Sequence, residues 1–476
     1  MKRSLCVVCL LLVGCTHTER ADLAVRDVAV VDVADGSVHP HQTVLVLDNR
    51  IVAVEPAGTA ELSEETEFVD GTGGYLIPGL WDAHVHSAGS LDWHFPLYIA
   101  YGITSVRNMH TSLEDPLNAV LSIKRRVASG ELLGPRFLAN GAVVDGDPPV
   151  WPGSVVVRNA DEARAAVDRL ADGGADFVKV YDRLTREAYF AILEHAKQRG
   201  IPVDGHLPFL IPAEKAAAAG QRTFEHLSGI TSGCASGADA LRADYARYLE
   251  RVPEMPPFPD QIVGFFRLVR REVDARDPEL CRQTARIFHR YGAASVPTLV
   301  ANAGSDPQGF VADAERMALV PPSVREGWRA MAAGPNPIGE LLGPVDATNL
   351  ENVRVLHEEA VVILAGTDVG NPFLLPGLSL HRELGRLTEA GLSPLEALQA
   401  ATLLPARVFG LDDSLGTVEA GKFADLVILD ANPLEDIANT QRIRAVIANG
   451  RLLRRPDLDQ LLHRVATMKP NEAEQK

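Results

Sequence analysis

The hydrophobic and polar positions divide the chain into two strand-rich ends and a long middle part. Both ends contain short runs of alternating or β-branched residues, separated by polar turn signals such as Asp35-Gly36 and Asp48-Asn49. Neither end offers enough strands for a core of its own, so we expect one small β-sandwich built from both ends. The expected strands are Leu23–Val31, Gln42–Leu47, Arg50–Val54, Ala424–Asp430 and Ile443–Gly450 with its turn.

From about residue 77 to residue 410, strand-like runs alternate with amphipathic stretches such as Ala160–Gly173, Leu184–Gly200 and Ile211–Gly220. Strands that alternate with helices predict parallel pairing. Eight of them predict an α/β fold, a (β/α)8 TIM-like barrel. The eight expected strands are Ile77–His84, Ile103–Arg107, Arg136–Ala139, Asp176–Tyr181, Pro202–Gly205, Arg222–Glu225, Ala294–Leu299 and Val361–Thr367.

These patterns predict the domain boundaries. The stretch from 230 to 293 is too long for one loop and one helix, and its Pro-rich middle separates two helical pieces. We interpret it as an insertion over the barrel mouth, either a lid or an elaboration with no role. The expected parts are a signal peptide (1–14), the first part of the β-sandwich (15–76), the barrel with this insertion (77–411) and the second part of the β-sandwich (412–476).

Composition and charge narrow the class of protein. Of the 476 residues, 46% are hydrophobic and 23% are charged, which is typical of a globular protein. The net charge of −17 repels phosphate backbones, so no nucleic acid partner is expected. Beyond the first 15 residues no apolar run reaches the ~20 residues needed to span a bilayer. The oligomeric state is left open.

The first residues predict export. Lys2 and Arg3 precede an apolar run, Leu5–Val13, which ends at Gly14-Cys15. The segment around Cys15 resembles a bacterial lipobox, which implies a lipid on the Cys15 thiol, an outer-membrane location facing the periplasm, and membrane contact only through that lipid. The alternative is an ordinary secretory signal. Two cysteines, Cys234 and Cys281, then remain free to pair in an oxidising compartment, and the sequence leaves this pairing open.

Two histidines end the first barrel strand. His84 and His86 are two residues apart, so an extended strand places both imidazoles on the same side. Active sites of such barrels lie at the carboxyl ends of the strands. The spacing alone could arise by chance, but its position at the end of a barrel strand makes the pair a candidate metal site.

Four later strands each carry or end in a group suited to the same centre: Lys179, His206, His226 and Asp368. Lys179 stands inside an apolar strand, where an amine is costly unless it is paired or neutralised. It either forms a buried ion pair, points between barrel and helices, or has reacted with CO2. The carbamate formed in that last case is an anion able to bridge two cations.

The motifs resemble those of the amidohydrolase superfamily, and most closely its imidazolonepropionase-like and prolidase-like hydrolases. The resemblance rests on His84-Val85-His86 after Pro78-Gly79, the strand lysine, the two single histidines and Asp368. It extends to further segments, namely 377–384, Ala400-Ala401-Thr402 with Pro405-Ala406, and 416–425.

The resemblance implies a binuclear centre. One divalent ion would be held by His84, His86 and Asp368, a second by His206 and His226, and carboxylated Lys179 would bridge them. Nitrogen and oxygen ligands with open positions suit Zn²⁺, with Mn²⁺, Fe²⁺ or Co²⁺ as alternatives. A hydroxide bridging the two ions would attack the scissile carbonyl. Asp368 would accept its proton and deliver it to the leaving amine, as ligand and catalytic residue.

The implied reaction is hydrolysis of an amide or peptide C–N bond in a small substrate, such as a dipeptide or an N-acyl amino acid. Tyr181, His110 and His381 are candidate substrate contacts, and Arg107, Arg183 or His110 is a candidate group for a substrate carboxylate. Two alternatives stay open. One is a hydrolase of the same fold acting on lactones, esters or phosphotriesters, or a deaminase. The other is a metal-binding lipoprotein without catalysis.

Overall fold

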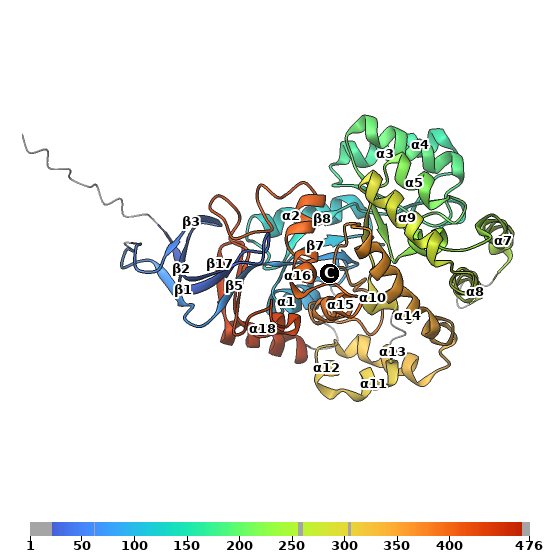
Figure 1. Cartoon of the computed structure of the whole chain (residues 1–476). Helices are drawn as coiled ribbons and strands as arrows, with labels where there is room; N and C mark the ends of the chain where they lie inside the picture. Colours follow the sequence, from blue (N-terminus) through green and yellow to red (C-terminus); the bar gives the residue numbers. More distant parts are fainter. Residues whose placement is uncertain (1–20, 61, 256–259, 303–305, 469–476) are drawn as a thin grey trace, which may run out of the picture.

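The computed structural model describes residues 21–60, 62–255, 260–302 and 306–468 (Figure 1). The expected signal peptide and the lipid-bearing Cys15 lie outside these ranges and stay predictions. No helix within the ranges is both long and apolar enough to cross a bilayer.

Strands from the two ends of the chain form one eight-stranded sheet, in the order β17-β16-β15-β5-β1-β2-β3, with β4 parallel to β1. The two ends meet where β15 pairs antiparallel with β5 and places Val427 opposite Ile77. The prediction that both ends build one β unit is confirmed. Its strands are β1 (Leu23–Val31), β2 (Val38–Leu47), β3 (Arg50–Pro56), β4 (Glu67–Asp70), β5 (Tyr75–Pro78), β15 (Leu426–Leu429), β16 (Ile443–Ala448) and β17 (Arg451–Arg454).

The middle part contains two sheets whose pairs are all parallel, in the orders β6-β7-β8 and β10-β9-β11-β12-β13-β14. A backbone hydrogen bond from Asp176 to the Ala139 carbonyl (2.8 Å) links the two sheets on one side. The strands are β6 (Leu80–Val85), β7 (Ile103–Asn108), β8 (Arg136–Ala139), β9 (Val144–Asp145), β10 (Val155–Val156), β11 (Val178–Val180), β12 (Val203–Gly205), β13 (Thr223–Glu225) and β14 (Ala294–Val296).

On the other side of the two sheets lies the segment expected as the eighth strand, 361–367. It makes only isolated parallel bridges, Ser295 with Ile363 and Val85 with nearby Val369. The segment therefore runs between β14 and β6 without forming a regular strand, which corrects the prediction. The ladder is interrupted because the Ala365 amide donates to a carbonyl outside both sheets, that of residue 400. The α/β fold is as predicted, whereas the described strands do not close into one continuous ladder.

Gly79 divides the first expected strand, Ile77–His84, into β5 of the terminal sheet and β6 of the barrel region. A Cβ at Gly79 would lie 2.0 Å from the Thr104 hydroxyl oxygen, so only glycine fits between the two strands. The Gly79 amide donates to the carbonyl of Asp425 (2.7 Å) and ties the two units together at this point.

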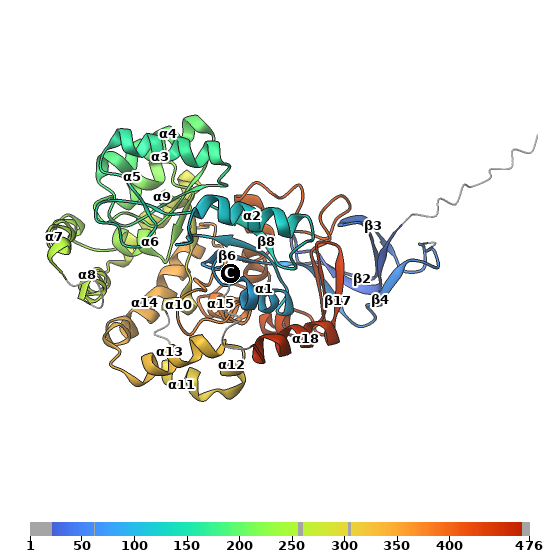
Figure 2. The same ribbon diagram turned by 180° about the vertical axis from the view of Figure 1, so that it is seen from behind.

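Helices cover the parallel strands (Figures 1 and 2). The stretch Ala160–Gly173 is a helix over the full predicted range, capped by the Asn159 side chain and ended by Gly174 in the left-handed region (φ 87°). Outside the insertion and the segment after β14, the helices are α1 (Leu91–Ala100), α2 (Pro116–Ala128), α3 (Ala160–Gly173), α4 (Arg186–Arg199), α5 (Ala213–Ala219), α15 (Leu378–Glu389), α16 (Pro394–Ala400), α17 (Leu403–Val408), η3 (Ile437–Gln441) and α18 (Arg455–Ala466). Of these, α18 packs on α1 and on strands β16 and β17 of the terminal sheet.

The insertion is helical, as its pattern indicates, and a disulfide between Cys234 and Cys281 joins its first and last helices. A second helical segment follows β14 and was not expected from the sequence, because most of its helices are short and separated by proline or glycine. The helices are α6 (Ser228–Gly233), α7 (Ala238–Arg251), η1 (Val252–Glu254), α8 (Ile262–Asp274) and α9 (Pro278–Tyr291), then α10 (Leu299–Asn302), α11 (Pro307–Ala312), α12 (Ala314–Ala318), α13 (Pro322–Ala333) and α14 (Pro337–Glu358).

Candidate metal centre

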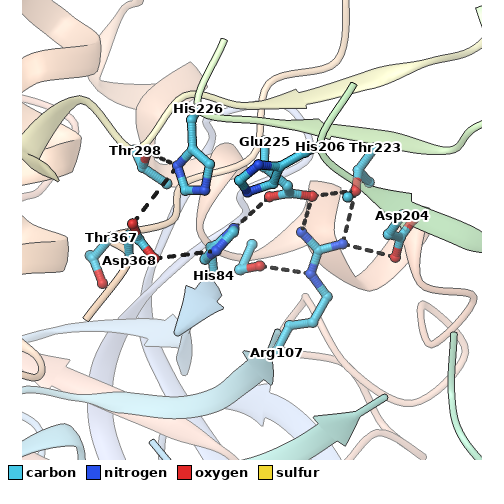
Figure 3. A network of polar contacts seen from close by, with 12 residues as sticks. His84, Arg107, Asp204, His206, Thr223, Glu225, His226, Thr298, Thr367 and Asp368 are labelled. Carbon is cyan, nitrogen blue, oxygen red and sulfur yellow. Dashed lines mark hydrogen bonds and ion pairs between the residues drawn. The ribbon is translucent and has the colours of Figure 1, made fainter. Parts of the chain in front are cut away.

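The six predicted ligands come from five separate strand segments and lie at or near their carboxyl ends. Parallel pairing brings these ends to one edge of the sheets, and Figure 3 shows four of the six in one polar network. The six are His84 in β6 and His86 just after it, Lys179 in β11, His206 after β12, His226 after β13, and Asp368 after the segment 361–367.

Asp368 lies at the middle of this group. Its Oδ1 is 3.0 Å from His86 Nε2 and 3.3 Å from His84 Nε2, and its Oδ2 is 4.0 Å from His226 Nδ1. Within the described part of the chain, ligand atoms of His84, His226 and Asp368 lie within 4.8 Å of one another. The backbone at Asp368 is left-handed (φ 62°), and its amide donates to the His84 carbonyl (2.8 Å). This turn fixes the carboxylate beside the imidazoles.

His206 extends the group on the side of His226. The ring centroids of His226 and His206 are 4.8 Å apart, and those of His226 and His84 are 4.5 Å apart. His226 is therefore adjacent to both His84 and His206. The four imidazoles and Asp368 form one cluster, as the sequence predicts.

Each of three imidazoles is held at Nδ1 by another protein group. A histidine fixed in this way presents its other nitrogen, Nε2, to a metal ion. The His84 Nε2 and Asp368 Oδ1 atoms are buried and have no hydrogen-bond partner in the described residues, as expected of ligand atoms facing a cation. The pairs are His84 with Glu225 (2.7 Å), His206 with Asp182 (2.9 Å) and His226 with Thr298 (2.7 Å).

Lys179 is 1% exposed, and its Nζ has no hydrogen-bond partner among the described residues. No carboxylate of the described residues lies within ion-pair distance of Lys179 Nζ. The interpretation of Lys179 as a partner in a buried ion pair is therefore not supported within these residues. Burial lowers the pKa of Lys179 to about 8, against an opposing effect of Glu225. The positive charge of Lys179 in turn lowers the pKa of His206 and His226, after the larger effect of burial. The amine therefore lies close enough to both imidazoles to affect them electrostatically.

A buried network supports His84 from behind, and the sequence did not reveal it. Arg107 donates to Glu225 Oε1 (2.9 Å) and to Asp204 Oδ2 (2.9 Å), and Glu225 Oε2 binds His84 (2.7 Å) (Figure 3). The side chains of all four residues have no exposed surface. Arg107 is thus unavailable to a substrate carboxylate, which corrects one of the candidate roles. The signal for this pairing was present, because a charge inside an apolar strand requires a partner.

The protonation states of the cluster suit cation binding. Burial alone would raise the pKa of Asp368, but the nearby imidazoles of His226, His84 and His86 hold it well below its usual range. Burial lowers the pKa of His86, and that of His206 well below the ordinary value. Asp368 is therefore an anionic carboxylate, and the neutral forms of His86 and His206 are favoured; these are the forms that ligate metals.

A cavity of about 1240 Å³ opens over the cluster. Tyr181 and His110 line it, as predicted for substrate contacts. The Tyr181 hydroxyl accepts a hydrogen bond from the Trp151 indole (2.7 Å), which leaves its own proton free to donate. Helices α7, α8 and α14 provide part of the wall, so the insertion forms part of the site.

His381 and Arg183 lie elsewhere. His381 Nδ1 is 2.9 Å from the Thr440 hydroxyl and Nε2 is 3.0 Å from the Tyr101 carbonyl oxygen. His381 is buried between helices and is not part of the cavity wall, which corrects the prediction. Arg183 is likewise not part of that wall, because its guanidinium donates to backbone carbonyls and to Gln261 Oε1 (3.0 Å).

The sequence profile described as the amidohydrolase family matches residues 311–453. Imidazolonepropionase of Rubrobacter xylanophilus is 26% identical over 435 residues, which are 86% of this chain and 90% of that enzyme. Adenine deaminase 3 of Rhizobium meliloti is 23% identical over 443 residues, 91% of this chain, and the chain spans 58% of that enzyme's length.

Solved structures agree on the fold. A bottromycin amidohydrolase has a TM-score of 0.70 at 25% identity, over 94% of this chain and 91% of the other. A Xaa-Pro dipeptidase with methionine bound in its active site has a TM-score of 0.64 at 21% identity, over 91% of this chain and 99% of the other. These matches extend the similarity from residues 311–453 to nearly the whole chain.

Proposed function

We propose that this chain, an amidohydrolase-type hydrolase as its motifs predicted, cleaves an amide or peptide C–N bond in a small substrate such as a dipeptide or an N-acyl amino acid. The observation that carries the proposal is the convergence of ligand groups from four strand segments at one cavity, which is lined by His86, His206, His226 and Asp368. The Xaa-Pro dipeptidase and the amidohydrolase among the similar structures support the choice of C–N bond.

The donor set fits two divalent cations. His84, His86 and Asp368 would hold one ion, and His206 with His226 the other. Lys179, after reaction with CO2, would supply a carbamate as a shared ligand, because its buried amine has no hydrogen-bond partner in the described ranges and a pKa of about 8 leaves part of it neutral and nucleophilic. Zn²⁺ suits nitrogen and oxygen ligands of this kind. Bound divalent ions supply Lewis acidity and lower the pKa of water.

Two side chains of the cavity would act in the reaction itself, one in proton transfer and one in stabilising the negative charge that develops on the substrate oxygen. Asp368 is held ionised, so it accepts the proton released when water attacks the carbonyl and passes it to the leaving amine. Tyr181 lines the cavity and accepts a hydrogen bond from Trp151, so its own O–H is available to donate to the oxygen on which negative charge develops. Neutral His206 and His226 remain ligands throughout.

A metal count and a substrate panel test the proposal. The full chain is purified in detergent and reconstituted with Zn²⁺ and bicarbonate. Elemental mass spectrometry of the acid-digested protein should then give two metal ions per chain. It should hydrolyse dipeptides or N-acyl amino acids faster than lactones, aryl esters or phosphotriesters. One ion per chain would contradict the binuclear site. Activity confined to the esters or phosphotriesters would replace amide hydrolysis with the alternative, and a metal-loaded chain without activity would leave only a binding role.

We also propose that the chain is exported and anchored by lipid on Cys15. The disulfide between Cys234 and Cys281 supports an oxidising compartment, because such bonds rarely persist in the cytosol. Labelling with radioactive palmitate should mark the wild type and not Cys15→Ser, and fractionation should place the wild type in the outer membrane. An unlabelled wild type would support an ordinary secretory signal instead.

A further inference from the structure

One wall of the cavity is aromatic. Phe209 stacks on Tyr245 (4.9 Å between centroids, 21° between planes) and on Phe265 (5.1 Å, 24°), and Phe266 adjoins Phe265 (5.0 Å). All four rings line the cavity, and they come from the loop after β12 and from α7 and α8. We call these four residues the aromatic wall. Tyr245 is buried, whereas Phe209, Phe265 and Phe266 are half-buried and retain ring surface for a ligand.

The aromatic wall has a fixed position relative to the metal centre. Phe209 is three residues after His206, and its amide donates to the Asp182 carbonyl (3.0 Å) while the Asp182 carboxylate holds His206. Arg183 ties the start of α8 to the barrel by donating to Gln261 (3.0 Å). The rings therefore form a preorganised surface at a set distance from the reacting carbonyl.

The cavity is larger than a minimal amide requires. Its volume of about 1240 Å³ exceeds the ~300–1,000 Å³ of ordinary small-ligand pockets. In the same cavity wall, Asn349 of α14 is 3% exposed. Its side-chain amide can both donate a hydrogen bond to a polar ligand group and accept one from it. The cavity thus offers one surface for an apolar group and one side chain for a polar group.

We propose that the substrate carries a planar aromatic group, which stacks on the aromatic wall while its amide lies at the metal centre and Asn349 bonds a polar atom between them. This inference rests on the proposed function. It makes Phe209, Phe265 and Phe266 specificity-determining residues for amide hydrolysis.

A cationic substrate group is the competing occupant, because aromatic rings also attract cations. The charges around the wall oppose it. Glu272 lies beside Tyr245, and burial raises its pKa to about 8, so this carboxyl carries little negative charge at neutral pH. Arg242, whose guanidinium pairs with exposed Asp239 (2.6 Å), adds a positive charge to the same wall. Both features favour a neutral ring.

The test measures the hydrolysis of a panel of substrates by the wild type and by one variant of the aromatic wall. The metal-loaded full chain is assayed with N-acetylglycine, N-acetylleucine, N-acetyllysine, N-acetylphenylalanine and N-benzoylglycine, so that the ring stands on the amino-acid side or on the acyl side. At least one aromatic compound should exceed N-acetylglycine in kcat/KM by about 10-fold or more, because a ring buries a large apolar area. Phe265→Ala should bring kcat/KM for that aromatic compound close to kcat/KM for N-acetylglycine in the same variant, with the metal content of the wild type. Tyr291→Ala, an exposed aromatic residue outside the cavity, is the matched control.

Each outcome decides the inference. Equal rates across the panel, or a preference for leucine or lysine, would overturn the aromatic substrate while the proposed function stands. If no compound is hydrolysed, the proposed function fails. Binding of the same compounds then still tests whether the aromatic wall selects an aromatic group. Calorimetric titration of the same compounds into the metal-free full chain should give tighter binding of an aromatic compound, by about 10-fold, and Phe265→Ala should abolish the difference. Equal affinities would refute the inference.

Discussion

Glu225 provides the most informative perturbation of the metal centre, because it touches a ligand without being one. Its carboxylate accepts from His84 Nδ1 (2.7 Å), from Arg107 (2.9 Å) and from the Thr223 hydroxyl (2.6 Å), and it has no exposed surface. Glu225→Gln keeps the shape and removes the charge. It leaves Arg107 with half of its buried counter-charge. The amide has one acceptor oxygen where the carboxylate has two, so with that oxygen turned to Arg107 and Thr223 its NH2 group faces the His84 ring in place of an acceptor.

Two separate losses are expected. Breaking a buried ion pair by removing one partner costs about 3–5 kcal/mol of unfolding free energy. Removing the acceptor behind a ligating histidine weakens metal affinity by about 10–100-fold, which is about 1.4–2.7 kcal/mol of binding. Bound metal stabilises the native state by mass action. The loss of unfolding free energy in Glu225→Gln should therefore be larger at a Zn²⁺ concentration that saturates the wild type than without Zn²⁺. The difference should be about the loss in metal-binding free energy.

The assay is urea unfolding of the full chain with and without Zn²⁺, together with competition for Zn²⁺ by a chromophoric chelator. Asp425→Asn is the matched control. Asp425 is also buried and bound by an arginine, Arg136, and it accepts from the Asn449 amide (2.6 Å), but it lies at the terminal sheet away from the metal cluster. The control should lose stability by a similar amount in both conditions and keep its affinity for Zn²⁺.

The reasoning would be refuted if Glu225→Gln bound Zn²⁺ as tightly as the wild type, or if its stability loss were the same with and without metal. In case this variant does not fold, Thr223→Val offers a milder change, since it removes one donor to the same carboxylate, about 1 kcal/mol. It should show a smaller loss of Zn²⁺ affinity. An unchanged affinity in that folded variant would also contradict the argument.

Four further changes test other parts of the site and the fold. Asp368→Asn should retain bound metal by mass spectrometry and lower kcat by about 10²–10⁴-fold, because it removes the proton acceptor; near-normal turnover would exclude that role. Lys179→Ala should reduce the metal count to one ion per chain or fewer, and two retained ions would argue against a bridging carbamate. Tyr181→Phe should lower kcat by about 10²–10³-fold with unchanged metal content, as expected for loss of a donor to the developing oxyanion; a change in KM alone would assign it to binding. Replacing Cys234 and Cys281 with serine opens a bond between positions 47 residues apart and should cost about 4 kcal/mol of unfolding free energy, measured by urea denaturation with matched reduction of the wild type as comparison.

The sequence alone identified the residues of the candidate metal cluster. Period-two spacing placed His84 and His86 on one face of a strand, and the alternation of strands and helices placed His206 and His226 at the same edge as Asp368. These are local rules about where a strand points and where it ends, so they hold before any tertiary contact is known. The same rules gave the helix Ala160–Gly173 and the joining of both chain ends.

Tertiary structure decided what surrounds those ligands. Arg107 had been a candidate for substrate binding, yet it neutralises Glu225 and Asp204 inside the barrel, and His381 lies between helices and not at the mouth. Neither outcome follows from residue spacing, because both depend on which side chains meet across distant elements. The aromatic wall has the same origin, since Phe209 and Phe265 are 56 positions apart in the chain and stack only after the insertion folds over the cavity. Local periodicity fixes the direction of a side chain, whereas its partner and its chemistry are set by packing.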